Sequence, residues 1–442
     1  MNNINVIKRD GTSVPLDISK IQRQVSYGCK GIDNVSPSMI EIKAQIELHD
    51  GMSTKTIDEL LLKAMVNLID ETENPDINNV NYQYVAGRQK VSMLRKEVYG
   101  DYTIPNLRDH IYNVIDAGYY DKDIINWYSD SELNILDNYI DHKRDFNIAY
   151  VGMEQFRGKY LIKNRANGKI YETPQMTYML IAMVLFRNYK ENRLKWVKDL
   201  YDATSNFEIS LPTPIMAGLR SPQKQFSSCV LIETDDSLDS INSTSSSIVK
   251  YVSQKAGIGI GAGRIRALGS PVRNGDTTHT GVIPFFKLFQ ASVKSCSQGG
   301  VRGGAATLYY PIWHLEVEDL LVLKNNKGTE DNRIRGLDYG VQFNKTIYER
   351  LLAGGNITLF SPNDCPDLYD AFFVDNEKFR ELYEKYERST KIRKKSLPAL
   401  ELFSAFMQER KDTGRIYLQN VDHANDHGSF IKEIAPIRQS NL

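Results

Sequence analysis

The chain has 442 residues, with 55 Lys and Arg against 55 Asp and Glu, and 41% of its residues are hydrophobic. This balance excludes the basic field of a nucleic-acid-binding protein and is typical of a soluble globular protein of two or three domains. No apolar run approaches the ~20 residues of a membrane span, and the start, MNNINVIKRDG, lacks the apolar segment of a signal peptide. Four cysteines are too sparse for a disulfide framework. The composition therefore predicts a reduced, cytoplasmic protein that binds neither nucleic acid nor membrane.

Residues 1–100 are predicted to form a small domain. Residues 4–17 have the pattern of a hairpin, with Asp10-Gly11 in the turn. Three or four helices should follow, the clearest beginning at the capping box Thr56–Glu59 and the last lying within 82–100.

Residues 101–205 are predicted to be mostly helical. One hairpin is expected within 160–172, with Asn167-Gly168 at its tip. The segment 177–186, TYMLIAMVLF, is the most apolar helix predicted in the chain.

From residue 206 onward, short apolar runs alternate with amphipathic helices. Strands are expected at 227–233, 257–265, 305–314, 356–360 and 415–421, and helices at 241–256, 281–296, 376–388 and 400–412. Such alternation favours a parallel sheet or barrel. The predicted fold class is α/β, with domains at 1–100, 101–205 and 206–442.

Two glycine-rich stretches can be interpreted in more than one way. Gly257–Gly263 satisfies a dinucleotide-binding fingerprint, but a helical pattern precedes it where a buried strand is required, so a Rossmann fold is not expected. Ser295–Thr307 carries four glycines around Arg302. It is either a flexible connector or a mobile loop that offers one cation and free N–H groups to a phosphate or a base.

The cysteines and paired histidines also have plain structural explanations. Cys29 is expected at a helix end in the core, and Cys365 in a surface loop. Cys229 opens a predicted strand, where a buried hydrophobe and a reactive thiol are both reasonable. His423 and His427 have metal-ligand spacing, but they lie in a turn-rich stretch without an intervening Glu, and no metal site is predicted.

Five segments together resemble the large (alpha) subunit of class I ribonucleotide reductase. They are residues 211–241, 256–281, 294–321, 413–423 and 435–442, among them LPTPIMAGLRSPQKQFSSCVLIETDDSLDSI and KSCSQGGVRGGAATLYYPIWHLEVEDLL. The resemblance extends over nearly the whole chain. It implies an N-terminal ATP-cone, a helical domain, and then the first half of a ten-stranded α/β barrel.

The resemblance also implies a reaction and the residues that serve it. The family reduces ribonucleoside diphosphates to 2′-deoxyribonucleoside diphosphates by thiyl-radical chemistry. Cys229 matches one of two cysteines that reduce the substrate, and Asn441 matches the Asn that hydrogen-bonds the ribose. Matches to positions that hold the substrate diphosphate are Thr213, Ser228 and Gly257.

Two regulatory nucleotide sites are implied as well. The specificity-effector site and its relay loop match Asp236, Ser237, Leu238, Arg266, Arg273, Gln298 and Arg302. The cone nucleotide site matches Lys8, Arg9, Lys20, Thr54 and Lys96. Within the cone, Val14 replaces a usual acidic residue and Asp58 a usual His. Because a carboxylate repels a triphosphate, we expect weak nucleotide binding and no inhibition by dATP.

The family pattern continues past Asn441 with the radical cysteine, so we expect this chain to work only with further polypeptide. A C-terminal half of the subunit on a second chain is the expected arrangement, as a divided gene in a large T4-like phage would give; a truncated chain is the alternative. The other expected partners and cofactors are a small subunit with a di-iron tyrosyl radical, a second large subunit, ATP or dNTP effectors with Mg²⁺, and thioredoxin or glutaredoxin as reductant. The rival hypothesis is a non-catalytic, nucleotide-binding regulatory module.

Overall fold

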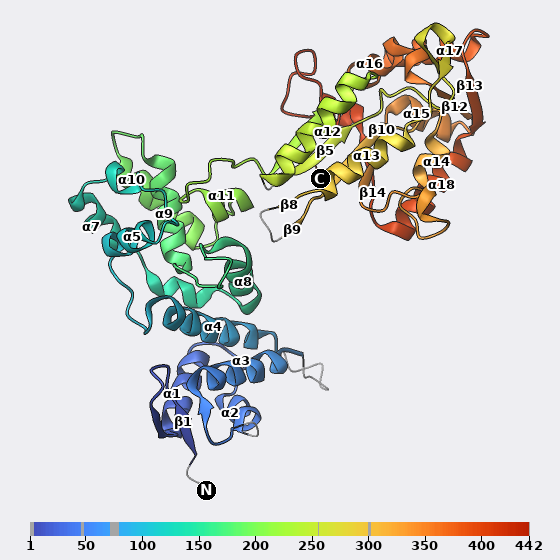
Figure 1. The fold of residues 1–442 in the computed structure, drawn as a ribbon. Helices are drawn as coiled ribbons and strands as arrows, with labels where there is room; N and C mark the ends of the chain where they lie inside the picture. Colours follow the sequence, from blue (N-terminus) through green and yellow to red (C-terminus); the bar gives the residue numbers. More distant parts are fainter. Residues whose placement is uncertain (1–3, 46–47, 71–78, 255, 299–301, 442) are drawn as a thin grey trace. The chain divides into compact units, whose positions relative to one another are not determined.

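The computed structural model describes residues 4–45, 48–70, 79–254, 256–298 and 302–441 (Figure 1). The chain forms two compact units, Met1–Phe226 and Ser227–Leu442. The domain boundaries expected at 100/101 and 205/206 stay predictions.

Among its described residues, the first part of unit 1 combines a small sheet with four helices. β1 (Asn5–Ile7) pairs antiparallel with β2 (Ser13–Pro15) and parallel with β3 (Met52–Ser53), which confirms the predicted hairpin. The helices are α1 (Ile18–Cys29), α2 (Pro37–Gln45), α3 (Thr54–Asp70) and α4 (Tyr82–Tyr99), with the 3₁₀ turn η1 (Asn79–Asn81) before α4. The α3 helix starts earlier than predicted, because the Ser53 hydroxyl accepts the Thr56 N–H at 3.0 Å and caps the helix.

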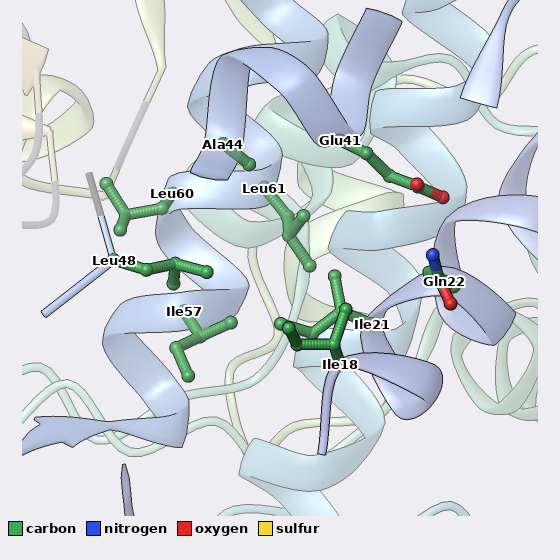
Figure 2. A pocket seen from close by; sticks show the side chains of 9 residues that line it. All are labelled: Ile18, Ile21, Gln22, Glu41, Ala44, Leu48, Ile57, Leu60 and Leu61. Atoms are coloured by element: carbon green, nitrogen blue, oxygen red, sulfur yellow. The ribbon is translucent and has the colours of Figure 1, made fainter. Parts of the chain in front are cut away.

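A small cavity lies among α1, α2 and α3. Figure 2 shows that its walls are mostly aliphatic, with Gln22 and Glu41 at one side. The lining residues are Ile18, Ile21, Gln22, Glu41, Ala44, Leu48, Ile57, Leu60 and Leu61. None of the predicted nucleotide residues lines it, so the cavity belongs to the packing of this core and not to the predicted cone site.

The rest of unit 1 is helical, as predicted. Its elements are α5 (Leu107–Asp116), α6 (Ile124–Trp127), α7 (Asp130–Tyr139), η2 (His142–Asn147), α8 (Tyr150–Gln155), the π-helical turn η3 (Phe156–Tyr160), α9 (Pro174–Phe186), α10 (Arg193–Ser205) and α11 (Thr213–Gly218). The residues from Pro174 to Val184 of α9 are all buried, as expected for an apolar core helix. The hairpin predicted at 160–172 is reduced to one antiparallel bridge, Lys163–Ile170, with Gly168 at φ +77° in the turn.

A buried ion pair ties this helical part together. Arg220 and Glu172 have fully buried side chains, and Arg220 Nε donates to Glu172 Oε2 at 2.8 Å. Arg220 also donates to the carbonyls of Met216 and Tyr160. The residues after α11 are therefore fixed to the segment before α9.

Unit 2 is built on a five-stranded parallel sheet. Its strands are β4 (Cys229–Glu233), β5 (Gly257–Gly261), β10 (Ala306–Pro311), β11 (Asp338–Phe343) and β14 (Ile416–Asn420), adjacent in chain order. Parallel neighbours require crossover connections, and helices supply them: α12 (Leu238–Ser253), α13 (Ile283–Lys294), α14 (Val317–Leu321), α15 (Lys345–Leu352), α16 (Pro366–Val374), α17 (Asn376–Arg388) and α18 (Ala399–Thr413) (Figure 1). The predicted parallel α/β fold is confirmed.

The two faces of this sheet differ in character. Val230, Ile258, Leu308 and Val341 point to one face and join the main hydrophobic core with the helices. Alternate residues point the other way, so Cys229, Gly257 and their register partners share the opposite face. We call it the open face; it is formed by Cys229, Leu231, Glu233, Gly257, Gly259, Gly261, Thr307, Tyr309, Asp338, Gly340 and Gln342.

Smaller elements lie outside this sheet. They are the strand pairs β6 (Pro271–Val272) with β7 (Thr277–Thr278), β8 (Ser297–Gln298) with β9 (Arg302–Gly303), and β12 (Asn356–Phe360) with β13 (Lys394–Pro398), the turns η4 (Arg273–Gly275), η5 (Glu330–Asn332) and η6 (Pro362–Asp364), and the helix α19 (Val421–Asp426). The strand predicted at 356–360 exists, but it pairs antiparallel with β13 and not within the parallel sheet.

Two cysteine predictions have different outcomes. Cys29 ends α1 and is buried, as predicted. The surface position predicted for Cys365 is wrong: the residue precedes α16, is fully buried in the main core, and donates its S–H to the Ser361 carbonyl at 3.4 Å. Burial raises the pKa of both thiols, that of Cys29 to about 11. In the described parts of the chain, no helix combines the length and apolar character that crossing a bilayer requires.

Candidate active site and effector sites

The candidate active site lies on the open face of the unit 2 sheet, where β4 and β5 begin. Cys229 and Gly257 are register partners in these two strands, and Gly257 N donates to Ser228 O at 2.8 Å. Cys229 is a half-buried free cysteine. Three of the predicted residues are thus brought together, with the thiol accessible at the strand start.

The segment that carries Asn441 crosses the same face. A Cβ atom built on Gly259 would lie 2.1 Å from the Ser440 carbonyl oxygen, so only a glycine leaves room for this backbone. Tyr309 of β10 donates its hydroxyl to the Asn441 carbonyl at 2.8 Å. The segment therefore passes over Gly259, two residues beyond the partner of Cys229.

Four charged side chains secure this segment at the other end of β4. Arg438 Nη1 lies 3.1 Å from Glu233 Oε1 and 3.4 Å from Asp370 Oδ1, and Arg264 contacts the same two carboxylates. The Arg438 carbonyl also accepts a hydrogen bond from Gln342. This network was not predicted, because its members are spread over two hundred residues of the chain.

Thr213, the remaining predicted substrate residue, begins α11 in unit 1. The structure places Thr213 relative to the other residues of unit 1 and not relative to unit 2. A role for Thr213 beside Ser228 and Gly257 therefore stays a prediction.

The predicted effector residues gather at the N-terminus of α12. Asp236 accepts hydrogen bonds from Arg266 at its backbone N (3.0 Å) and its Nε (2.8 Å), and Arg266 Nη1 donates to the Pro271 carbonyl at 2.7 Å. Ser237 caps α12 by accepting the Ser240 N–H, and Leu238 is two-thirds exposed at the helix start. The positive end of a helix beside an arginine suits an anionic ligand.

For the other predicted effector residues, the structure gives mainly the position of the backbone. Arg273 lies in the turn between β6 and β7 at φ +52°. Gln298 and Arg302 are backbone partners in β8 and β9. The structure describes neither residues 299–301 nor the side chains of Gln298 and Arg302. The relay role of Gln298 and Arg302 therefore stays a prediction.

The predicted cone site centres on Asp58. This residue is 4% exposed, and its Oδ2 lies 3.0 Å from Lys96 Nζ and 3.7 Å from Arg9 Nη2. Gln24 Nε2 donates to its Oδ1 at 3.0 Å. Burial opposes the charge of Lys96, but its contacts with Tyr102 and Asp58 hold its pKa above the ordinary value. Two predicted nucleotide cations are therefore paired with an internal carboxylate.

The other cone residues do not join this cluster through any contact in the described structure. Lys8 follows β1, Thr54 opens α3, and Lys20 lies in α1, where its Nζ is 3.9 Å from Asp17.

The two histidines with metal-ligand spacing lie at the end of α19. His423 lies in α19 and His427 directly follows it, with ring centroids 5.6 Å apart. Within the described ranges, no three His, Cys, Asp or Glu side chains form a cluster that could hold a metal ion.

Three family profiles match the chain in order. They are the ATP cone domain over residues 4–97, the ribonucleotide reductase all-alpha domain over 146–224, and the ribonucleotide reductase barrel domain over 227–442.

Whole-chain comparisons agree with these profiles. The chain is 56% identical over 438 residues to ribonucleoside-diphosphate reductase subunit alpha of Haemophilus influenzae, and 56% identical over 441 residues to subunit alpha of Escherichia coli reductase 1. It is 51% identical over 443 residues to the alpha subunit of Enterobacteria phage T4. These alignments cover 99–100% of this chain but only 57–58% of the relatives' length. The chain thus belongs to the family of ribonucleoside-diphosphate reductase alpha subunits.

Proposed function

We propose that the chain supplies the N-terminal part of the catalytic subunit of a ribonucleoside-diphosphate reductase, which converts ribonucleoside diphosphates to 2′-deoxyribonucleoside diphosphates. The observation that carries the proposal is the open face of the unit 2 sheet. There the half-buried thiol of Cys229 pairs in register with Gly257, and the segment bearing Asn441 crosses the neighbouring Gly259.

In this proposal Cys229 is one of two reducing thiols. The ribose loses its 2′-hydroxyl as water, and two thiols become one disulfide, which balances the two electrons and the two hydrogens required. Cys365 does not serve as the second thiol, because it is buried in the core on the helix side of the sheet. Cys29 is buried in unit 1, and Cys296 packs against the same helix-side core as Cys365. The second thiol is therefore proposed to come from the remainder of the reductase barrel.

Substrate binding is proposed to use short polar groups. Ser228 and Thr213 offer hydroxyls and Gly257 a backbone without a side chain, which suits a diphosphate approaching closely. Asn441 is proposed to hydrogen-bond the ribose.

Two regulatory roles follow from the other sites. The Asp236–Arg266 pair at the start of α12 is proposed to bind a dNTP effector with Mg²⁺, with Arg266 toward the phosphates. The cone is proposed to bind nucleotide weakly and not to impose dATP inhibition, since Asp58 already holds Arg9 and Lys96.

Partners are proposed from the family. They are the remainder of the alpha subunit, whether continuous with this chain or a separate polypeptide, a second alpha subunit, a small subunit with a di-iron tyrosyl radical, and thioredoxin or glutaredoxin as reductant. The cytoplasmic location expected from the sequence stays a prediction.

Reconstitution tests the proposal. The chain is combined with the remainder of the alpha subunit and the small subunit, and conversion of CDP to dCDP is measured with dithiothreitol as reductant. Turnover should appear with all components, disappear in Cys229→Ser, and persist in Cys296→Ser, a matched loss of another half-buried thiol. Full turnover by Cys229→Ser would contradict the proposal. Nucleotide binding without any turnover by the complete assembly would favour the regulatory-module hypothesis.

A further inference from the structure

Residues 436–441 form a segment laid across the open face of the sheet, which we call the crossing segment. Its backbone meets the sheet at Gly259, and the side chain of Gln439 lies against Gly261, 3.0 Å from where a Cβ would be. At its start, Ile437 N donates to Asn425 Oδ1 at 2.7 Å. At its end, the contact that holds the Asn441 backbone is the Tyr309 hydroxyl, at 2.8 Å.

The side chain of Tyr309 is itself tightly packed against the sheet. It is 4% exposed, and its ring occupies the space above Gly340, where a Cβ would come within 2.2 Å of the ring carbons. Burial raises the pKa of Tyr309 to about 12, so the phenol stays protonated and donates at neutral pH. The ring is fixed by packing, and its hydroxyl meets the crossing segment at the Asn441 carbonyl and beside the Ser440 side chain.

We propose that Tyr309 is a positioning residue for Asn441, acting through the backbone of the crossing segment. This inference rests on the proposed function, in which Asn441 contacts the ribose. Asn441 is exposed, and its side-chain Oδ1 accepts only from the neighbouring Ser440 hydroxyl at 3.2 Å among the described contacts. Its placement over the open face therefore comes through the backbone, and at Asn441 itself the Tyr309 hydroxyl is the anchor.

Small displacements of such a group matter because catalysis requires reacting groups in a narrow range of geometry. A misplacement of ~1 Å can cost on the order of a hundredfold in rate. Loss of one neutral hydrogen bond shifts an equilibrium by roughly threefold to tenfold. Removal of the Tyr309 hydroxyl is thus expected to lower kcat by about tenfold. The KM for the nucleoside diphosphate should change by less than about twofold, because the change leaves Ser228 and Gly257, the residues proposed to hold the diphosphate at the start of β4 and β5, untouched.

The chain offers a matched control one residue away. Tyr310 is also fully buried, but it points into the helix-side core, and its hydroxyl has no hydrogen-bond partner among the described residues. Tyr309→Phe and Tyr310→Phe are the same chemical change in the same strand on opposite faces.

The first measurement is steady-state CDP reduction by the fully reconstituted reductase. We expect Tyr309→Phe to lower kcat about tenfold with KM nearly constant, and Tyr310→Phe to leave both within about twofold of the unmodified protein. An unchanged kcat in Tyr309→Phe, or equal losses in both variants, would overturn the proposal.

The second measurement is amide hydrogen exchange of a peptide spanning 436–441 in the same assembly. Tyr309→Phe should accelerate exchange in this peptide, whereas Tyr310→Phe should not. Gly259→Ala should also accelerate it, since the new Cβ would collide with the Ser440 carbonyl. If the unmodified assembly shows no turnover, the proposed function fails while the exchange result still decides whether Tyr309 anchors the segment.

Discussion

Asp58 and Lys96 form an ion pair inside the cone, with 3.0 Å between Oδ2 and Nζ and with Asp58 almost fully buried. Arg9 shares the same carboxylate at 3.7 Å. A bound triphosphate would have to compete with this internal anion for both cations, and it would also meet the negative charge of Asp58 itself. We therefore expect weak nucleotide binding in this cone, because of its geometry as well as its charge.

Replacing Asp58 by Asn should strengthen binding of dATP to the cone. The amide keeps the shape but removes the competing charge, so we expect affinity to rise by about tenfold, or ~1.4 kcal/mol. Calorimetric titration of dATP, with saturating dTTP filling the proposed effector site, measures it. Glu59→Gln is the control, because it removes the same charge from the exposed neighbouring position in α3. Tight dATP binding by the unmodified chain, or equal gains in both variants, would contradict this explanation.

Breaking the buried Glu172–Arg220 pair should strongly destabilise unit 1. Replacing either residue alone leaves an uncompensated buried charge, at a cost of about 3–5 kcal/mol. Urea unfolding of Glu172→Met and Arg220→Met should show this loss, while the double variant that carries both changes should lose less than the sum. Asp199→Asn breaks the exposed Lys195–Asp199 pair and should cost less than about 1 kcal/mol.

The same pair predicts a pH dependence of stability. Burial alone would raise the pKa of Glu172, but the charge and hydrogen bonds of Arg220 hold it below its ordinary value of 4.5. A carboxyl whose pKa is lower in the folded state stabilises that state above the unfolded pKa and stops doing so as pH falls through the folded pKa. The free energy of unfolding should therefore fall with acidification below about pH 4.5, and Glu172→Gln should make that fall shallower. If the free energy of unfolding of Glu172→Gln falls with acidification as steeply as that of the unmodified protein, other carboxyl groups cause the fall.

Much of this fold could be predicted because its signals are local. The α9 helix is apolar all round, and β4 and β10 are short apolar runs between helices, so each was identified from sequence. The β11 strand was not predicted, although it lies inside the sheet between β10 and β14. Its sequence DYGVQF is buried throughout, and its Asp, Gly and Gln break the apolar run that marks a buried strand.

The site was predicted only in part, for a related reason. Cys229, Gly257 and Asn441 were found through resemblance, and the structure explains how the sheet register joins the first two. Tyr309 and Gly340 were missed because their importance arises from a contact between neighbouring strands and a segment a hundred residues later. Cys365 was misplaced because the polar residues around it suggest a loop, while the chain there turns into the core.

The effector site should depend on Arg266 more than on positive charge in general. Arg266 is held by Asp236 and the Pro271 carbonyl, so its guanidinium is fixed beside the start of α12. We expect Arg266→Gln to weaken dTTP binding at least tenfold, because the bidentate donor and the charge are both lost. Lys250→Gln removes the same charge in the last turn of α12 and should change affinity by less than about twofold. Equilibrium dialysis measures the dTTP affinity of both variants. An equal loss of affinity in the two would mean that binding depends only on net charge and not on the position of Arg266.

Cys229 should be the cysteine of this chain that is oxidised by turnover. It is half-buried on the open face, whereas Cys29 and Cys365 are buried and burial raises the pKa of both thiols, which disfavours the reactive thiolate. After a single turnover without added reductant, mass spectrometry of a non-reduced digest should find Cys229 in a disulfide with a cysteine outside residues 1–442. If the remainder of the subunit is supplied as a separate chain, the same bond should link the two chains on a non-reducing gel. Cys296 is also half-buried, so Cys296→Ser is the control that should leave the crosslink intact. A crosslink that survives in Cys229→Ser would assign the redox role to another thiol and remove the basis for placing the active site at the start of β4.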